Sequence, residues 1–245
     1  IRDISFRLEP GSVLGLIGRT GSGKTTITRL LLRLHDPTAG TVCIGDTDLR
    51  DFRLAELRDR IGVVTQDIQL FQASVRDNLT FFNPAFDDPA IIAILHDLGL
   101  SRWLDALPDG LDTQLASGAG GLSAGEAQLL AFARVFLHDS RIVILDEASS
   151  RLDPATERGV ERAVDRLLAG RTGIVIAHRL ATVKRADEIM VLADGRIVEY
   201  GPRELLANDP ASRFAHMLRT GEDLVLSADD ETSAAVPEPV TGARP

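Results

Sequence analysis

The chain has 245 residues, of which 44% are hydrophobic and 26% are charged, and its formal net charge is −9. No run approaches the 18 or more apolar residues needed to cross a bilayer, and the N-terminus shows no signal-peptide pattern. Residues 221–245 hold six acids and one arginine, so they contribute −5 and the rest only −4, which argues against a nucleic acid bound to a basic patch.

Strand-like and helical patterns alternate along the chain. Residues 12–18, SVLGLIG, indicate a strand that leads directly into a glycine-rich loop, and apolar spacing from Ile27 to Leu34 predicts the helix after it. The lone cysteine, Cys43, is expected to be a packed strand residue rather than a reactive thiol. Further strands are expected at residues 4–11, 41–45, 61–66, 141–147, 173–178 and 188–195, with 195–201 as a hairpin partner and a short helix near 54–60. This alternation predicts an α/β fold with a mainly parallel sheet.

The interval from Phe71 to about Leu137 is helical in pattern, with turn signals at residues 83–84 and 108–110. We interpret it as an inserted helical subdomain of about residues 71–138. Residues 221–245 are acidic, rich in alanine and proline and poor in large apolar side chains, so we expect a disordered tail there.

The segment GRTGSGKT fits the P-loop pattern of a glycine, four residues and then Gly-Lys-Thr. In such a loop backbone N–H groups meet phosphate oxygens at a helix N-terminus, and glycines are needed because side chains would block the approach. Lys24 is expected to reach the β- and γ-phosphates, and the Thr25 hydroxyl to bind Mg²⁺. The expected nucleotide-binding residues are Gly18, Arg19, Thr20, Gly21, Ser22, Gly23, Lys24, Thr25 and Thr26.

Two acids follow the apolar run from Ile142 to Leu145. A buried strand of this kind would hold Asp146 rigidly at the edge of the sheet where ligands bind, as a Mg²⁺ ligand requires. Because successive side chains of a strand alternate in direction, Glu147 would point the other way, and it could polarise an attacking water.

In this order the motifs resemble the nucleotide-binding domain of ABC transporters, most closely the exporter type, from Ile1 to about Arg219. Gln66 in VVTQD matches the Q-loop glutamine, and LFQASVRDNL, residues 70–79, is similar to the exporter segment that follows it. LSAGE, residues 122–126, stands where the family has the signature LSGGQ. Three further matches are the Walker B pair Asp146 and Glu147, the D-loop Ser150 to Asp153, and the switch histidine His178 in IAHRL.

The resemblance implies a P-loop NTPase fold, with a RecA-like core, an antiparallel β subdomain and an inserted α-helical subdomain, that hydrolyses ATP with Mg²⁺. Two such domains would pair head to tail, with ATP between the P-loop of one and the signature of the other. The implied catalytic residues are Glu147, His178 and Lys24; the implied metal ligands are Thr25, Gln66 and Asp146; and Gln66, Ser123, Gly125, Glu126 and Asp153 join the nucleotide-binding set.

Three positions depart from the family pattern. Ala124 replaces a glycine and adds a methyl group, and Glu126 replaces a glutamine and adds a negative charge near an anion, so both are expected to weaken the site that this signature completes. Ser117 stands where exporters have a glutamate that contacts the transmembrane coupling helices, so the coupling contacts are expected to differ.

The leading hypothesis is therefore an exporter ATPase on the cytoplasmic face of the plasma (inner) membrane, with an unidentified substrate. Its expected partners are a second nucleotide-binding domain, in a homodimer or a heterodimer, and a transmembrane domain preceding Ile1 in the same chain. Two alternatives stay open: a separately encoded importer ATPase, and a mainly regulatory half of an asymmetric heterodimer. DNA-repair and chromosome-organising ATPases are excluded because they have long coiled coils between P-loop and signature, whereas Leu122 follows Lys24 by only 98 residues.

Overall fold

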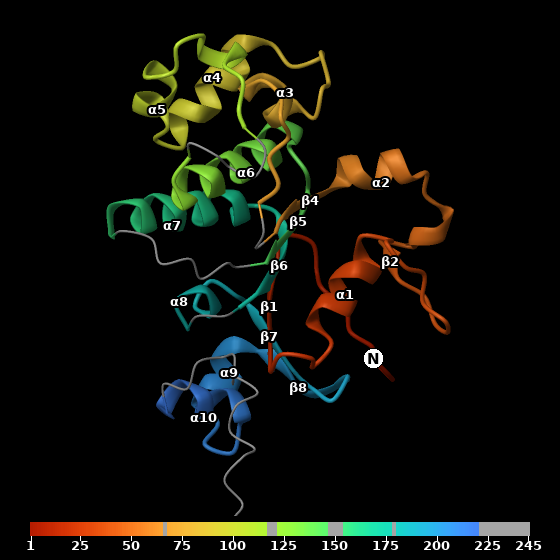
Figure 1. The fold of residues 1–245 in the computed structure, drawn as a ribbon. Coiled ribbons are helices and arrows are strands. Elements are labelled where there is room, and N and C mark those ends of the chain that lie inside the picture. Colours follow the sequence, from red (N-terminus) through yellow and green to blue (C-terminus); the bar gives the residue numbers. More distant parts are fainter. Residues whose placement is uncertain (66–67, 117–121, 147–153, 178–179, 221–245) are drawn as a thin grey trace, which may run out of the picture.

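A six-stranded sheet with strand order β4-β5-β6-β1-β7-β8 forms the centre of the protein (Figure 1). The structure, a computed structural model, describes residues 1–65, 68–116, 122–146, 154–177 and 180–220. The first five strands of the sheet are parallel, and β8 pairs antiparallel with β7. The predicted mainly parallel α/β fold is confirmed. The strands are β1 (Val13–Gly18), β4 (Ile61–Val64), β5 (Ile142–Asp146), β6 (Thr172–Ile176), β7 (Glu188–Ala193) and β8 (Arg196–Pro202).

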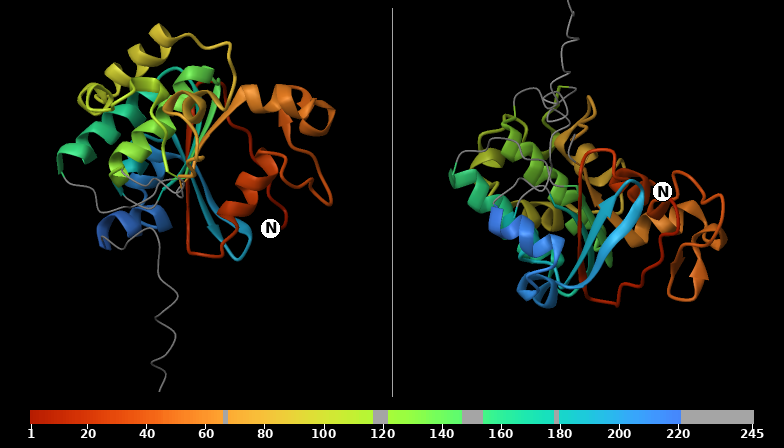
Figure 2. Two further views of the ribbon diagram at one scale, coloured as in Figure 1. Left: turned by 45° about the horizontal axis from the view of Figure 1, so that its top comes forward. Right: turned by 90° about the horizontal axis from the view of Figure 1, so that it is seen from below.

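Side chains of β1 alternate between two separate cores, one on each face of the sheet. Val13 and Ile17 belong to the core that includes α6 and α7, whereas Leu14 and Leu16 belong to the core that includes Ile27 of α1. Figures 1 and 2 show α1 and α2 on one side of the sheet and α6 and α7 on the other. Coverage of both faces explains why the parallel strands are almost entirely apolar. The bounds are α1 (Lys24–Leu31), α2 (Leu54–Arg60), α6 (Ala124–His138) and α7 (Pro154–Leu168).

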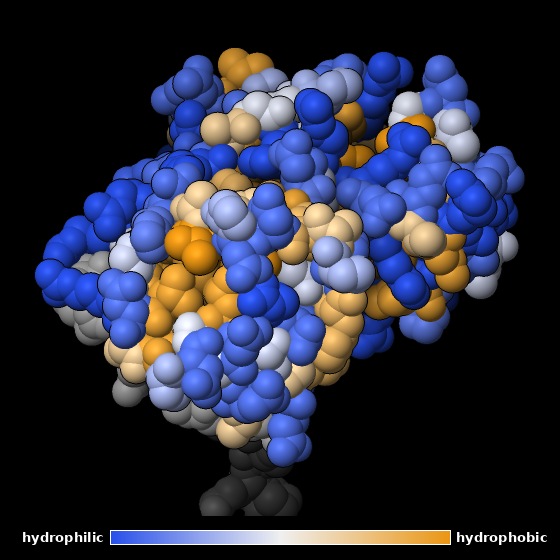
Figure 3. Space-filling model, turned by 90° about the horizontal axis from the view of Figure 1, so that it is seen from above, coloured by the Kyte–Doolittle hydropathy of each residue, from blue (hydrophilic) through white to orange (hydrophobic). Residues whose placement is uncertain are grey.

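A helical layer lies beyond α6, at the top of Figure 1. Its elements occupy the interval whose sequence pattern is helical: α3 (Val75–Thr80), α4 (Asp88–Asp97), α5 (Ser101–Asp105) and the 3₁₀ turn η2 (Gly110–Asp112). Seen from this side, the surface is mostly polar, with apolar groups gathered between the polar ones (Figure 3). Among the described residues no helix is both long and apolar enough to span a bilayer.

Two polar side chains, Arg134 of α6 and Asn78 of α3, attach this layer to the segment that follows β4. The Arg134 guanidinium donates to the carbonyl oxygens of Asn78 at 2.8 Å and Gln69 at 3.0 Å. Asn78 is 1% exposed, and its amide donates to the carbonyl oxygens of Phe71 and Ser74, both at 3.0 Å. Burial lowers the pKa of Arg134 to about 10, so the guanidinium is still charged at neutral pH. Residues 69–74 are thus held by these side chains, and at their end by a backbone bond of 2.9 Å from the Leu115 N–H to the Ala73 carbonyl oxygen.

The chain ends, within the described part, in helices packed beside β8. The carboxylate of Glu199 on β8 accepts the backbone N–H groups of Arg213 at 3.1 Å and Phe214 at 2.9 Å, and the Ser212 hydroxyl at 3.1 Å. A carboxylate is favoured at the positive end of a helix, so this contact anchors the start of α10. These helices are α9 (Arg203–Asn208) and α10 (Arg213–Thr220), whereas α8 (Leu180–Val183) lies earlier in the chain, between β6 and β7.

Two expectations from the sequence are wrong. Residues 4–11 form no strand: Ile4, Phe6 and Leu8 do pack against the core on the α1 side, as their alternation suggested, but their backbone joins no ladder. Cys43 lies in a strand but is exposed, because the pleat turns its neighbour Ile44 toward the core and Cys43 away from it. Its hairpin comprises β2 (Cys43–Ile44) and β3 (Thr47–Asp48), followed by the 3₁₀ turn η1 (Leu49–Asp51).

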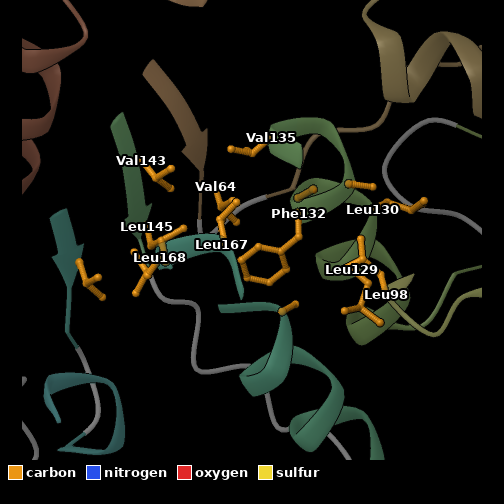
Figure 4. Close-up of a cluster of buried hydrophobic side chains, with 14 of the residues drawn as sticks. Val64, Leu98, Leu129, Leu130, Phe132, Val135, Val143, Leu145, Leu167 and Leu168 are labelled. Carbon is orange, nitrogen blue, oxygen red and sulfur yellow. The ribbon is translucent and has the colours of Figure 1, made fainter. Parts of the chain in front are cut away.

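Phe132 provides a test of the core between α6 and the sheet. It is 2% exposed, and its ring projects from α6 toward the sheet among Leu145 and Leu167 (Figure 4). Phe132→Ala should lower the free energy of unfolding by about 3–5 kcal/mol, because it leaves a cavity that the neighbours cannot fill. Leu205→Ala, at a side chain that is 69% exposed, is the control and should change it by less than about 0.5 kcal/mol. Equal losses in denaturant titrations of the two variants would contradict this description of the core.

Candidate nucleotide-binding site

The glycine-rich loop leaves the carboxyl end of β1, which lies between β6 and β7. Gly18, the last residue of β1, is paired in register with Leu192 of β7. Residues 19–23 form the loop, and α1 begins directly after them at Lys24. Ligands of open α/β sheets bind outside the carboxyl ends of the strands, so the loop lies at the edge where a phosphate site is expected.

The loop is so tightly closed at Gly18 that a side chain has no room there. A Cβ added to Gly18 would lie 2.4 Å from the Leu192 carbonyl oxygen and 2.6 Å from Ser22 Oγ. Ser22 itself is 4% exposed, and its Oγ has no hydrogen-bond partner among the described residues. Because buried hydroxyls are normally hydrogen-bonded, this orphaned oxygen fits a loop whose remaining partner is a phosphate.

Lys24 points back into the loop and is only 8% exposed. Its ammonium donates to the carbonyl oxygens of Gly18 and Arg19, the second at 3.0 Å. Burial lowers the pKa of Lys24, while the charge of Asp146 at the end of β5 acts in the opposite direction. The fold therefore brings the P-loop cation and the β5 carboxylate, which are far apart in sequence, within electrostatic reach of each other.

The start of α1 offers backbone donors to an anion. Gly23 is the N-cap residue, with φ of 112°, and it supplies no side-chain hydrogen bond to the first turn. The N–H groups at a helix N-terminus have no partner within the helix, and the helix dipole adds to their attraction for a negative charge. The other loop residues expected at the nucleotide, Arg19, Thr20, Gly21, Thr25 and Thr26, are exposed.

The residues present fit Mg²⁺ held jointly with phosphates. Within the described ranges no group of three His, Cys, Asp or Glu side chains could hold a metal by itself. Mg²⁺ is commonly bound by one or two protein oxygens together with substrate phosphates and waters. The Thr25 hydroxyl, in the first turn of α1, and the Asp146 carboxylate, at the end of β5, are of the right chemistry for this arrangement.

Four predicted site residues, Gln66, Glu147, Asp153 and His178, lie outside the described residues. Their roles remain predictions. The strands that precede three of them end at Val64, Asp146 and Ile176, at the same edge of the sheet as Gly18.

The predicted signature residues stand at the start of α6. Ser123 is the N-cap, and Glu126 completes a capping box with it. The Glu126 carboxylate accepts the Ser123 N–H at 2.8 Å and the Ser123 hydroxyl at 2.9 Å, while the Glu126 N–H donates to Ser123 Oγ at 3.2 Å. Ser123 and Ala124 are exposed and Gly125 is buried. Glu126 is thus a helix cap, a role that the pattern Ser-x-x-Glu before an apolar run indicates and that the motif comparison with the family signature did not predict.

The structure does not bring the signature to the P-loop of the same chain. The loop is followed by α1 and the signature opens α6, and these helices cover opposite faces of the sheet. Across the described residues, no hydrogen bond or ion pair joins Ser123 or Glu126 to residues 18–26.

Comparison with known proteins places these features in a family. The family model described as "ABC transporter" matches residues 1–150. ABC transporter B family member 21 of Arabidopsis thaliana is 39% identical over 93% of this chain and 18% of its own length. The ATP-dependent lipid A-core flippase of Bordetella avium is 45% identical over 84% of this chain and 35% of its own length.

Among solved structures, a bacterial Atm1-family ABC exporter with ATP bound superposes with a TM-score of 0.80 and 32% sequence identity, over 89% of this chain and 38% of that one. The chain therefore spans little more than a third of these proteins, or less. With its P-loop, its β5 carboxylate and these relatives, the chain belongs to the ABC transporter family and is similar to the ATPase domain of its exporters.

Proposed function

We propose that this chain powers export across a membrane through ATP-driven pairing of two nucleotide-binding domains. The observation that supports this most directly is Lys24, which is buried in the loop and within electrostatic reach of Asp146. The same loop holds the buried Ser22 hydroxyl, which has no hydrogen-bond partner among the described residues. The exporter relatives supply the direction of transport, and they favour export over the alternative of a separate importer ATPase.

In this proposal the P-loop binds the phosphates of ATP and two carboxylates divide the remaining work. Asp146, with Thr25 and Gln66, would hold Mg²⁺, which when bound neutralises charge on the phosphates. Glu147 would accept a proton from, or orient, the attacking water. Lys24 and His178 would stabilise the charge that develops on the γ-phosphate.

The proposed active unit is a dimer, since the helix that follows the P-loop and the helix that the signature opens lie on opposite faces of the sheet. Ser123 and Gly125 of one domain, with Asp153, would complete the ATP site of the other. The transmembrane part is proposed to belong to the same full-length protein, because the relatives are much longer than this chain. The domain would then lie on the cytoplasmic face of the membrane, followed by an acidic tail from residue 221.

A second candidate, an asymmetric heterodimer with one slow site, is favoured by the contact between Ser123 and Glu126. The Ser123 hydroxyl has one proton, and that proton is directed to the Glu126 carboxylate. A γ-phosphate at Ser123 would have to compete with this carboxylate and would be repelled by its charge. The composite site that this signature completes is therefore the weaker one.

Glu147→Gln separates binding from chemistry. We expect the variant of the full-length transporter to retain ATP binding and to lose at least about a hundredfold in ATPase turnover, the range contributed by a positioned general base. Lys24→Ala is the reference, in which binding is also lost. Turnover of Glu147→Gln equal to that of the wild type would exclude the role proposed for this carboxylate.

Glu126→Gln tests the competition at the signature. An amide oxygen can still accept the Ser123 N–H, so the helix cap survives while the charge is removed. We expect several-fold faster ATP turnover and dimer formation at a lower ATP concentration. Asp77→Asn is a matched control. In the first turn of α3 the Asp77 carboxylate likewise accepts a hydrogen bond of 2.7 Å from the hydroxyl of an N-cap serine, Ser74. A gain that Asp77→Asn reproduces, or no gain at all, would count against the competition.

A further inference from the structure

The turn between β7 and β8 lies against the P-loop. It consists of Asp194 and Gly195, which have φ of 49° and 74° between the paired residues Ala193 and Arg196. Two left-handed residues are typical of a type I′ turn, one of the two turn types that match the right-handed twist of hairpin strands. Figure 2, seen from below, shows this turn beside the first residue of the chain and the start of α1.

One hydrogen bond joins the turn to the loop: the Gly195 N–H donates to the Ser22 carbonyl oxygen at 3.1 Å. The turn also lies close to the next residue of the loop: a Cβ added to Gly23 would lie 3.7 Å from Gly195 Cα. On its other side the turn is held by the Arg2 N–H, which donates to the Gly195 carbonyl oxygen at 2.9 Å, and by an ion pair of 3.0 Å between Arg196 and Asp3. The turn is therefore fixed from both sides.

The direction of the Ser22 carbonyl decides the direction of a donor in the loop. Ser22 C=O and Gly23 N–H belong to one planar trans peptide, so they point in opposite directions. When Gly195 holds the carbonyl on the hairpin side, the Gly23 N–H is turned to the opposite side of the loop. Gly23 is the N-cap of α1, and its N–H is one of the donors at this helix end.

We propose that Gly195 is a positioning residue for nucleotide binding: by holding the Ser22 carbonyl it keeps the Gly23 N–H turned toward the phosphates. This inference rests on the proposed binding of ATP by the P-loop. In this proposal Gly195 acts on the nucleotide indirectly, through the Ser22 carbonyl. The left-handed backbone at residue 195 directs its N–H to the Ser22 carbonyl. Glycine adopts this conformation readily, whereas most residues with a side chain disfavour it.

Three variants of the full-length transporter test the proposal. Alanine and asparagine add the same Cβ, which would lie 3.3 Å from Ile1 Cα, but asparagine tolerates the left-handed conformation and alanine does not. Gly195→Ala should raise the KM for ATP roughly tenfold, the size of one hydrogen bond to a charged group, with little change in kcat. Gly195→Asn should stay within about threefold of the wild type, since a backbone that remains left-handed keeps the bond.

Gly45→Ala is the matched control, because Gly45 also stands in a two-residue hairpin turn, between β2 and β3, with φ of 59° and open space around it. Alanine is strained at this positive φ as well, and the variant should leave the KM for ATP unchanged. Melting temperatures of all variants, recorded alongside, report general destabilisation.

The outcomes are distinct. A KM of Gly195→Ala within twofold of the wild type overturns the proposal, as does an equal rise in Gly45→Ala or in Gly195→Asn. If Gly195→Ala does not fold, the comparison of Gly195→Asn with Gly195→Ser decides, and equal KM values for these two overturn it. Failure of the proposed function looks different: the wild type would then bind ATP no better than Lys24→Ala.

Discussion

The pairing of β1 with β7 up to Gly18 and Leu192 is the constraint on which the rest of the site depends. It brings the Leu192 carbonyl so close that no side chain fits on Gly18, and the chain must turn at once into a loop. That turn starts α1 at Lys24, whose ammonium folds back on the loop carbonyls. The parallel strands β5 and β6 end at the same edge of the sheet as β1. Strand pairing is therefore enough to place Asp146, the last residue of β5, at that edge.

Helix α6 contributes to the core through its middle and to the proposed nucleotide site through its first residues. Its middle is core, with Phe132 and Ala133 almost fully buried, and its first residues are exposed at the signature. A capping box stabilises such a helix by about 1 kcal/mol, and Glu126 provides it. The same bonds occupy the N–H and the hydroxyl of Ser123, the donors that an anion would use. In the proposed composite site, the bonds that cap α6 would therefore compete with ligand binding at Ser123.

The P-loop is supported by elements from the distant end of the chain as well as by its own helix. β7 contacts Gly18, and the turn that follows it bonds to Ser22. The hairpin of β7 and β8 is in turn anchored to α10 through Glu199. Loop, hairpin and C-terminal helix are therefore linked by a continuous series of hydrogen bonds.

The amino-acid sequence by itself determined the P-loop, the strand ending in Asp146 and the α/β alternation, because these depend on consecutive residues and on local periodicity. The tertiary structure alone decided which side chains face which core, so Cys43 is exposed and residues 4–11 pack without pairing. It also decided the bond between Gly195 and Ser22, which lie far apart along the chain. No local pattern encodes that contact, since it arises only when the sheet places β7 beside β1.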